Sequence, residues 1–224
     1  MHVTSILAAV LGLVISGPDE APIARVNLVG TAASLCVLFD SPNVHKELGL
    51  SPEQAKSCAE LAKTTRKRLA ATYQAVNRTG SSADAQTRDV KDIEATFSKE
   101  TSQALAKILT TAQLERLKQI SLQSGTVATF LEPSVKEALT LNDAQVTAFN
   151  AIQNEARRTI QGDVRAGKID RNAIRDKALV LRQEGRAQAI AMLSKEQKTA
   201  WDALIGKPFF LGDESPKDIE LQKK

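Results

Sequence analysis

One segment of this chain occurs twice, as VHKELGLSPEQ at residues 44–54 and as VKEALTLNDAQ at residues 135–145. The copies stand 91 positions apart, and the matches continue downstream at apolar positions spaced three or four residues apart. That spacing is typical of one buried face of a helix. A chain that repeats a helical segment of this length is expected to fold as two similar units.

Each copy is predicted to form a helical hairpin. The second halves of the copies align at a shorter offset of 84, so the second copy lacks seven residues between its long helices. In the first copy that connection, residues 77–86, is rich in turn-forming residues. We therefore expect an all-α fold with two tandem hairpin units, residues 18–123 and 124–211. The expected long helices are 52–76, 86–108, 143–166 and 170–192, with shorter ones near 42–49, 111–123, 133–140 and 195–205.

A short motif occurs at four of the expected helix starts: Leu, then Ser, Thr or Asn, and then Gln three residues later. Its second residue suits an N-cap, and its glutamine suits the third helical position, from which the side chain reaches back to the cap N–H. This capping box is sufficient to explain the motif, so we favour a structural role for it. The motif residues are Leu50, Ser51, Gln54, Leu109, Thr110, Gln113, Leu141, Asn142, Gln145, Leu193, Ser194 and Gln197.

In their helical context the four motifs resemble the LTxxQ motif of the periplasmic Spy/CpxP family of exported stress proteins. The resemblance covers residues 42–205 and implies an all-helical fold with a long bent hairpin. Relatives in that family include ATP-independent chaperones, inhibitors of envelope sensor kinases and metal-responsive regulators. Family members carry two motifs and pair into a curved cradle, whereas this chain carries four. Our hypothesis is that one chain imitates the two-subunit cradle, with an oligomer as the alternative.

The N-terminal residues 1–17 are predicted to be a signal peptide. Ile6–Ile15 is an apolar run of ten residues, which is the size of a signal-peptide core and too short to span a bilayer. No Lys or Arg precedes Arg25, which departs from the usual signal pattern. We expect an exported protein of the periplasm or cell envelope, with no membrane span in the mature chain. Residues 212–224 are predicted to form a charged, flexible tail.

The composition argues against several function classes. Histidine occurs only at His2 and His45, which leaves few residues for a Ser-His-Asp set or a metal site. No glycine-rich phosphate loop is present. The net charge is +4, with 26 acidic residues interspersed among 30 basic ones, which does not favour nucleic acid. We expect no enzyme activity, no metal, no cofactor and no nucleic-acid partner.

Two basic pairs coincide in the two copies, Arg66-Lys67 and Arg157-Arg158. Their stems either cover the core at a solvated helix edge or line a groove that attracts an acidic or unfolded partner. Apolar surface in excess of the core would bind such a partner too, although core packing is the favoured role of each large side chain. The large side chains considered are Tyr73, Phe97, Phe149, Leu181 and Trp201.

The two cysteines, Cys36 and Cys58, both belong to the first unit. In an exported protein they could form a disulfide that joins the leading segment to the first long helix. The alternative is a pair of buried thiols. The sequence leaves both alternatives open.

The sequence thus predicts an exported, non-enzymatic helical protein that binds unfolded or envelope proteins, similar to ATP-independent periplasmic chaperones and stress regulators of the Spy/CpxP type. One alternative is a structural or scaffolding protein of the cell envelope with one fixed partner. Another is a regulatory binder of a sensor domain. Promiscuity distinguishes the first prediction, because a chaperone binds many unfolded chains with modest affinity.

Overall fold

The computed structural model describes residues 32–78, 83–166 and 171–210, and every regular element within these ranges is a helix. The predicted all-α class is therefore confirmed. The predicted signal peptide at 1–17 and the predicted tail at 212–224 lie outside the described residues. The elements in chain order are α1 (Ala32–Phe39), α2 (Pro42–Glu47), α3 (Pro52–Arg78), α4 (Ala83–Ile108), α5 (Thr111–Ser124), the 3-10 helix η1 (Val127–Leu131), α6 (Pro133–Ala138), α7 (Asp143–Arg165), α8 (Arg171–Ala191) and α9 (Lys195–Ile205).

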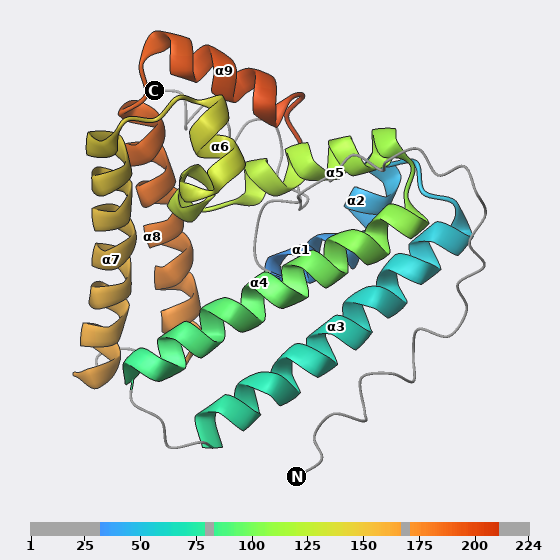
Figure 1. Cartoon of the computed structure of the whole chain (residues 1–224), viewed down its shortest axis with the longest axis horizontal. Helices are drawn as coiled ribbons and strands as arrows, with labels where there is room; N and C mark the ends of the chain where they lie inside the picture. The colour runs from blue at the N-terminus through green and yellow to red at the C-terminus, as the bar shows by residue number, and fades with distance from the viewer. Residues whose placement is uncertain (1–31, 79–82, 167–170, 211–224) are drawn as a thin grey trace.

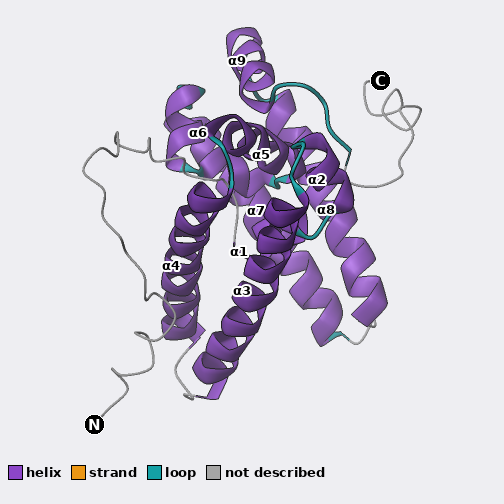
Figure 2. Ribbon diagram, turned by 90° about the vertical axis from the view of Figure 1, so that its right-hand side faces the viewer, coloured by secondary structure: helices purple, strands orange, loops and turns teal. Residues whose placement is uncertain are grey.

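The long helices pack in two pairs, α3 with α4 and α7 with α8. Both pairs extend to the same side of a group of short helices, α2, α5, α6 and α9, which we call the hub (Figure 1). In the view turned by 90°, the ends of the two pairs that lie away from the hub are separate (Figure 2). In the half of each pair that lies away from the hub, apolar side chains are therefore buried by the two helices of that pair and by segments packed along them.

Local sequence accounts for where these helices begin. Pro42, Pro52 and Pro133 each stand at the start of a helix, where the missing N–H is not needed. All four motifs form capping boxes. In each one the cap side chain accepts from the glutamine N–H and the glutamine side chain accepts from the cap N–H, and the caps are Ser51, Thr110, Asn142 and Ser194.

The two copies enter their long helices through the same backbone turn. Gly49 has a φ of +58° and Thr140 has a φ of +50°, and these residues are 91 positions apart. The N–H groups of Leu50 and Leu141 each donate to the carbonyl five residues earlier, at 3.0 Å in both copies. This is a Schellman-type helix end, which favours glycine at the left-handed residue. Thr140 is therefore the strained member of the pair.

Two buried clusters meet at α5. The first contains α1 and the hub ends of α3 and α4, and α5 contributes Leu117 and Ile120 to it. The second surrounds Phe130 and Phe149, and α5 contributes Leu122 to it. One short helix therefore joins the hydrophobic cores of the two units.

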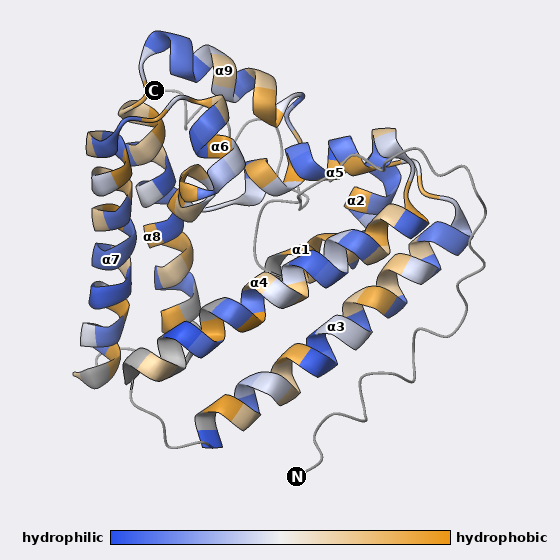
Figure 3. Cartoon of the chain, viewed as in Figure 1, coloured by the Kyte–Doolittle hydropathy of each residue, from blue (hydrophilic) through white to orange (hydrophobic). Residues whose placement is uncertain are grey.

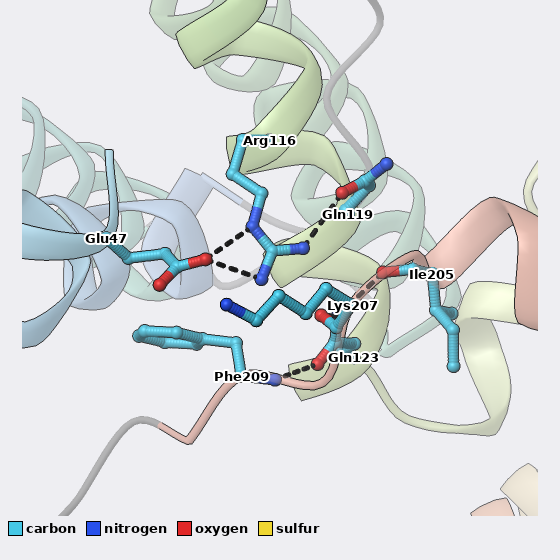
Figure 4. A network of polar contacts seen from close by, with 7 residues as sticks. All are labelled: Glu47, Arg116, Gln119, Gln123, Ile205, Lys207 and Phe209. Carbon is cyan, nitrogen blue, oxygen red and sulfur yellow. Dashed lines mark hydrogen bonds and ion pairs between the residues drawn. The ribbon is translucent and has the colours of Figure 1, made fainter. Parts of the chain in front are cut away.

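The chain after α9 returns to the first unit (Figure 4). The Gln123 amide donates to the carbonyls of Ile205 and Lys207, at 2.6 and 2.8 Å. Its oxygen accepts from the N–H of Phe209 at 2.7 Å. The Phe209 side chain packs against the first buried cluster. Phe209 thus anchors the segment that follows α9 on the first unit.

A second set of polar contacts holds α5 to α2 in the same region (Figure 4). Arg116 Nε donates to Glu47 at 2.8 Å, and Arg116 Nη1 donates to Gln119 Oε1 at 2.8 Å.

Gly206 ends α9 with a φ of +62°. A Cβ at that position would lie 2.5 Å from the Gln119 amide carbon, so the glycine allows the close approach of α9 to α5.

Candidate functional site

The motif glutamines of the first unit pair with each other. Gln54 Nε2 donates to Gln113 Oε1 at 3.0 Å, and Gln113 Nε2 donates to Gln54 Oε1 at 3.2 Å. Each amide also donates to a main-chain carbonyl beside the other motif, Ile108 at 2.9 Å and Leu48 at 3.2 Å. The pair therefore fixes the start of α3 against the start of α5.

The second unit repeats this arrangement. Gln145 Nε2 donates to Gln197 Oε1 at 2.7 Å, and the reverse bond is 3.0 Å. The carbonyls of Met192 and Thr140 accept the remaining amide hydrogens, at 3.1 and 3.4 Å. Sequence reasoning found the caps and missed the pairing. The available signal was glutamine at all four positions, because glutamate could complete the capping box but has no hydrogen to donate.

The basic pairs do not form two equivalent patches. Arg66 donates to the Cys36 carbonyl at 2.8 Å and pairs with Asp40 at 2.6 Å, so it holds the C-terminal end of α1 against α3. Arg158 pairs with Glu155 one turn earlier on α7. Lys67 and Arg157 are exposed. The interpretation of these pairs as matching groove walls is corrected, since their partners differ between the units.

Three of the candidate binding residues, Phe97, Phe149 and Trp201, belong to the core, which is the role that the sequence favoured, and so they offer no binding surface. Phe149 and Trp201 pack on Phe130, with ring centroids 5.5 and 4.4 Å apart. Phe97 lies between α3 and α4 with only 6% of its surface exposed. A buried aromatic ring removes roughly 150 to 250 Å² from solvent.

Tyr73 and Leu181 are partly exposed. Tyr73 packs against the cluster of Leu69 and Phe97, and its hydroxyl donates to Glu94. Burial and the adjacent carboxylate both raise the pKa of this phenol. Tyr73 therefore contributes to the packing of the far half of the first pair. Leu181 lies on α8, in the second pair.

A shallow groove of about 520 Å³ lies on the first pair. Arg68 crosses it, with its guanidinium carbon 4.9 Å above the Phe97 ring and a 3.0 Å ion pair to Glu100. Asp92 also lines it. The cation in this groove is thus Arg68, which sequence reasoning did not single out, and acidic neighbours offset its charge.

The far half of the second pair is less covered than that of the first. In the first pair, Leu69 and Phe97 pack with Tyr73 and Ile93 and are 4% and 6% exposed. The matching residues of the second pair, Ile160 and Leu181, are only partly buried. The counterparts of Tyr73 and Ile93 are Val164 and Lys177, which are a smaller and a charged side chain. Figure 3 shows hydrophobic residues along α7 and α8 beyond the end that faces α6.

We call this uncovered surface the open face. On α7 its residues follow Phe149 at helical spacing, and on α8 they precede Ala189, which packs beside η1 in the second cluster. Val164 is 46% exposed, two residues are partly buried, and two arginines are exposed at its edges. The open face consists of Arg157, Ile160, Val164, Ala178 and Arg182.

Arg186 joins the two units and was not identified from the sequence, where Ser102 is its counterpart in the first copy. Its Nη1 donates to the carbonyls of Leu122 and Gly125, at 2.9 and 3.0 Å, at the C-terminal end of α5. The guanidinium lies 5.3 Å from the centre of the Trp201 ring. Burial lowers the pKa of Arg186. A cation at this position stabilises the negative end of the α5 dipole.

Cys36 and Cys58 are free thiols, and both are buried, which is the second of the two alternatives. Burial raises the pKa of the Cys58 thiol to about 11 and also raises that of Cys36. Among the described residues, no three His, Cys, Asp or Glu side chains are grouped as metal ligands. None of the helices in the described ranges has the length and apolar character needed to cross a membrane.

Comparisons of the chain with protein-family models, curated proteins and solved structures found no match. The resemblance to the Spy/CpxP family therefore depends on the four motifs and their helical context. The open face is the described surface on which a binding role can be argued.

Proposed function

We propose that this is an exported, non-enzymatic protein that holds other proteins without ATP, metal or cofactor, in the manner of the Spy/CpxP chaperones. Its partners are apolar segments of unfolded or envelope proteins. The two units of one chain take the place of the two subunits of the family's cradle. A mass measurement that finds an obligate dimer would contradict this last point.

The open face is the observation that carries the proposal. Its centre is apolar: Ile160 is only partly buried where the first unit buries Leu69, and Val164 is exposed where the first unit has the partly buried Tyr73. Its edges carry the exposed cations Arg157 and Arg182. Burial of apolar area contributes about 25 cal/mol per Å² without regard to sequence, so a surface of this kind suits modest, promiscuous binding.

Aggregation of two unrelated unfolding proteins tests the proposal. The protein, at a near-equal molar ratio and without ATP, is expected to slow the aggregation of both. The double variant Ile160→Ser, Val164→Ser should lose most of this effect while its helix content by circular dichroism is unchanged. Val180→Ser is the matched control, since Val180 is 49% exposed on another side of α8.

Two outcomes contradict the proposal. If the aggregation of neither unfolding protein is slowed, the alternatives of an envelope scaffold with one fixed partner or a regulatory binder of a sensor domain are favoured. If Val180→Ser and the double variant weaken the effect equally, the open face is not the binding surface.

A further inference from the structure

Residues 206–210, which follow α9 and which we call the strap, are held on α5 by one side chain. The Gln123 amide nitrogen donates to the Lys207 carbonyl at 2.8 Å, and the amide oxygen accepts from the Phe209 N–H at 2.7 Å. A carbonyl and the N–H two residues later are the groups that a peptide unit of a parallel strand binds on its neighbour. Pro208, between them, has no N–H to leave unpaired. Gln123 therefore binds the strap as a neighbouring strand would, through main-chain groups.

The same contact seats one aromatic side chain. Phe209 packs against the first buried cluster, and its ring is directed toward Glu47 of α2 (Figure 4). Main-chain hydrogen bonds that tolerate many sequences, together with a seat for one side chain, are the means by which proteins bind extended peptides. The surface under the strap has both parts.

The strap is held by few interactions. It is not helical, Lys207 and Pro208 are exposed, and Phe209 is only partly buried. Beyond Gly206, its hydrogen bonds within the described residues are those to Gln123, and the bond from the Lys207 carbonyl is exposed. Segments with few buried contacts and exposed hydrogen bonds open locally at a small fraction of the free energy of global unfolding. The strap is therefore expected to open while α9 stays folded.

From these contacts we infer that the strap is an intramolecular occupant of a peptide-binding site on α5, and that an extended segment of another protein displaces it. The main chain of the incoming segment takes the two hydrogen bonds of Gln123, and an aromatic side chain takes the place of Phe209. The site requires this aromatic residue two positions after the bonded carbonyl. It is separate from the open face and does not depend on the function proposed for that face.

A peptide with the sequence of residues 206–212, GKPFFLG, is the probe. It carries an N-terminal fluorophore and a C-terminal amide, and fluorescence anisotropy measures its binding to the full-length protein. Because the strap competes with the peptide, the apparent Kd is raised by the fraction of molecules in which the strap is closed. We expect Phe209→Ala, which loosens the strap, to lower Kd about fivefold or more.

Matched variants locate the site. Phe210→Ala removes the neighbouring ring, which is not packed against the first cluster within the described residues, and should leave Kd within about twofold of the original. Gln123→Ala, added to Phe209→Ala, should raise Kd about fivefold or more, since the peptide loses its main-chain partner. Serine in place of the first phenylalanine of the peptide should also raise Kd, and serine in place of the second should not. Circular dichroism verifies that each variant keeps its helix content.

Hydrogen exchange of the unaltered protein gives a test that needs no variant. Saturating peptide should speed the exchange of the Phe209 N–H, as measured by NMR, because this group loses Gln123 as its acceptor. The amides within α9 should exchange as before.

Three results would overturn the inference. The first is no binding of the peptide by either the original protein or Phe209→Ala, which leaves the proposed function intact if the protein slows aggregation. The second is an equal change of Kd in Phe209→Ala and Phe210→Ala. The third is binding that leaves the exchange of the Phe209 N–H unchanged, which would mean that the peptide binds elsewhere. Peptide binding as expected, without any effect on aggregation, would contradict the proposed function alone.

Discussion

The side-chain amides of Gln54 and Gln113 hydrogen-bond to each other in both directions, at 3.0 and 3.2 Å. Each oxygen also accepts from its own cap N–H, and each nitrogen also donates to a main-chain carbonyl beside the partner motif. One residue type thus completes a helix cap and a contact between distant segments at once. Only a side chain that both donates and accepts can do this.

Replacement of one glutamine by glutamate separates these two roles. In Gln113→Glu the carboxylate still accepts the cap N–H, but the Leu48 carbonyl loses its donor. We expect the free energy of unfolding at neutral pH to fall by about 1 to 3 kcal/mol, since a part-buried acceptor is left unpaired. Urea unfolding measures it, with the exposed Gln103→Glu as control.

The same variant predicts a pH effect of known sign. When protonated, the carboxyl introduced by Gln113→Glu would donate as the amide does, so folding raises its pKa above the unfolded value. A group of this kind destabilises the fold progressively as pH rises through the unfolded pKa of about 4.3 toward the folded one. The deficit of Gln113→Glu should therefore shrink at acid pH. A deficit independent of pH would contradict the assigned donor role.

Thr140 offers a stabilising change. Its φ of +50° belongs to the left-handed region. A residue with a Cβ is destabilised there by about 1 to 2 kcal/mol, whereas glycine adopts this conformation without a steric penalty. Thr140→Gly is expected to raise the free energy of unfolding by about 1 kcal/mol, less the greater chain entropy of glycine. The reverse change at the matching turn, Gly49→Thr, should lower it. If both changes lowered stability equally, backbone strain would not explain the turn.

The sequence predicted the helices well, and the reasons are local. Apolar spacing and four capping boxes define where α3, α5, α7 and α9 begin. A cap involves residues three apart, so neighbouring letters suffice to identify it. The pairing of the four glutamines could not be predicted in this way. The partners are 59 and 52 residues apart, and nothing local specifies that contact.

The candidate surface was harder to predict for a physical reason. Periodicity identifies the apolar side of a helix and does not say what covers it. Phe149 on α7 and Trp201 on α9 both pack against Phe130 in the core. Ile160, on the same apolar side of α7 as Phe149, is only partly buried. Leu69, the counterpart of Ile160, packs with Tyr73, Phe97 and Ile93, whereas the second copy has Val164, Leu181 and Lys177 at those positions. Arg186 was missed because its partners are backbone carbonyls.

Arg186 should contribute strongly to the union of the two units. Arg186→Met keeps most of the apolar stem but leaves the Leu122 and Gly125 carbonyls without their donor. We expect a loss of about 2 to 3 kcal/mol, because hydrogen bonds from charged groups are the stronger kind. Trp201 is the only tryptophan, so its fluorescence follows unfolding beside the substituted residue. Arg158→Met, at a highly exposed ion pair, should stay within about 0.5 kcal/mol of the original.

The buried thiols predict a loss of stability in alkali. Because folding raises the pKa of Cys58 from 9.0 to about 11, the folded chain keeps a proton that the unfolded chain releases. Stability from this group is complete below the unfolded pKa and declines as pH rises toward the folded one. We expect about 2 kcal/mol less between about pH 8 and pH 11, with Cys36 acting in the same direction.

Urea unfolding across that pH range, repeated on Cys58→Ala, isolates the contribution of this thiol. The variant should be less stable at neutral pH, since it leaves a small cavity, and its alkaline decline should be shallower, because one thiolate no longer forms in the unfolded chain. Tyr73 adds a decline of the same sign through its raised pKa and is present in both proteins, so it cancels in the difference. Parallel curves for the two proteins would show that Cys58 ionises as readily in the folded chain as in the unfolded one.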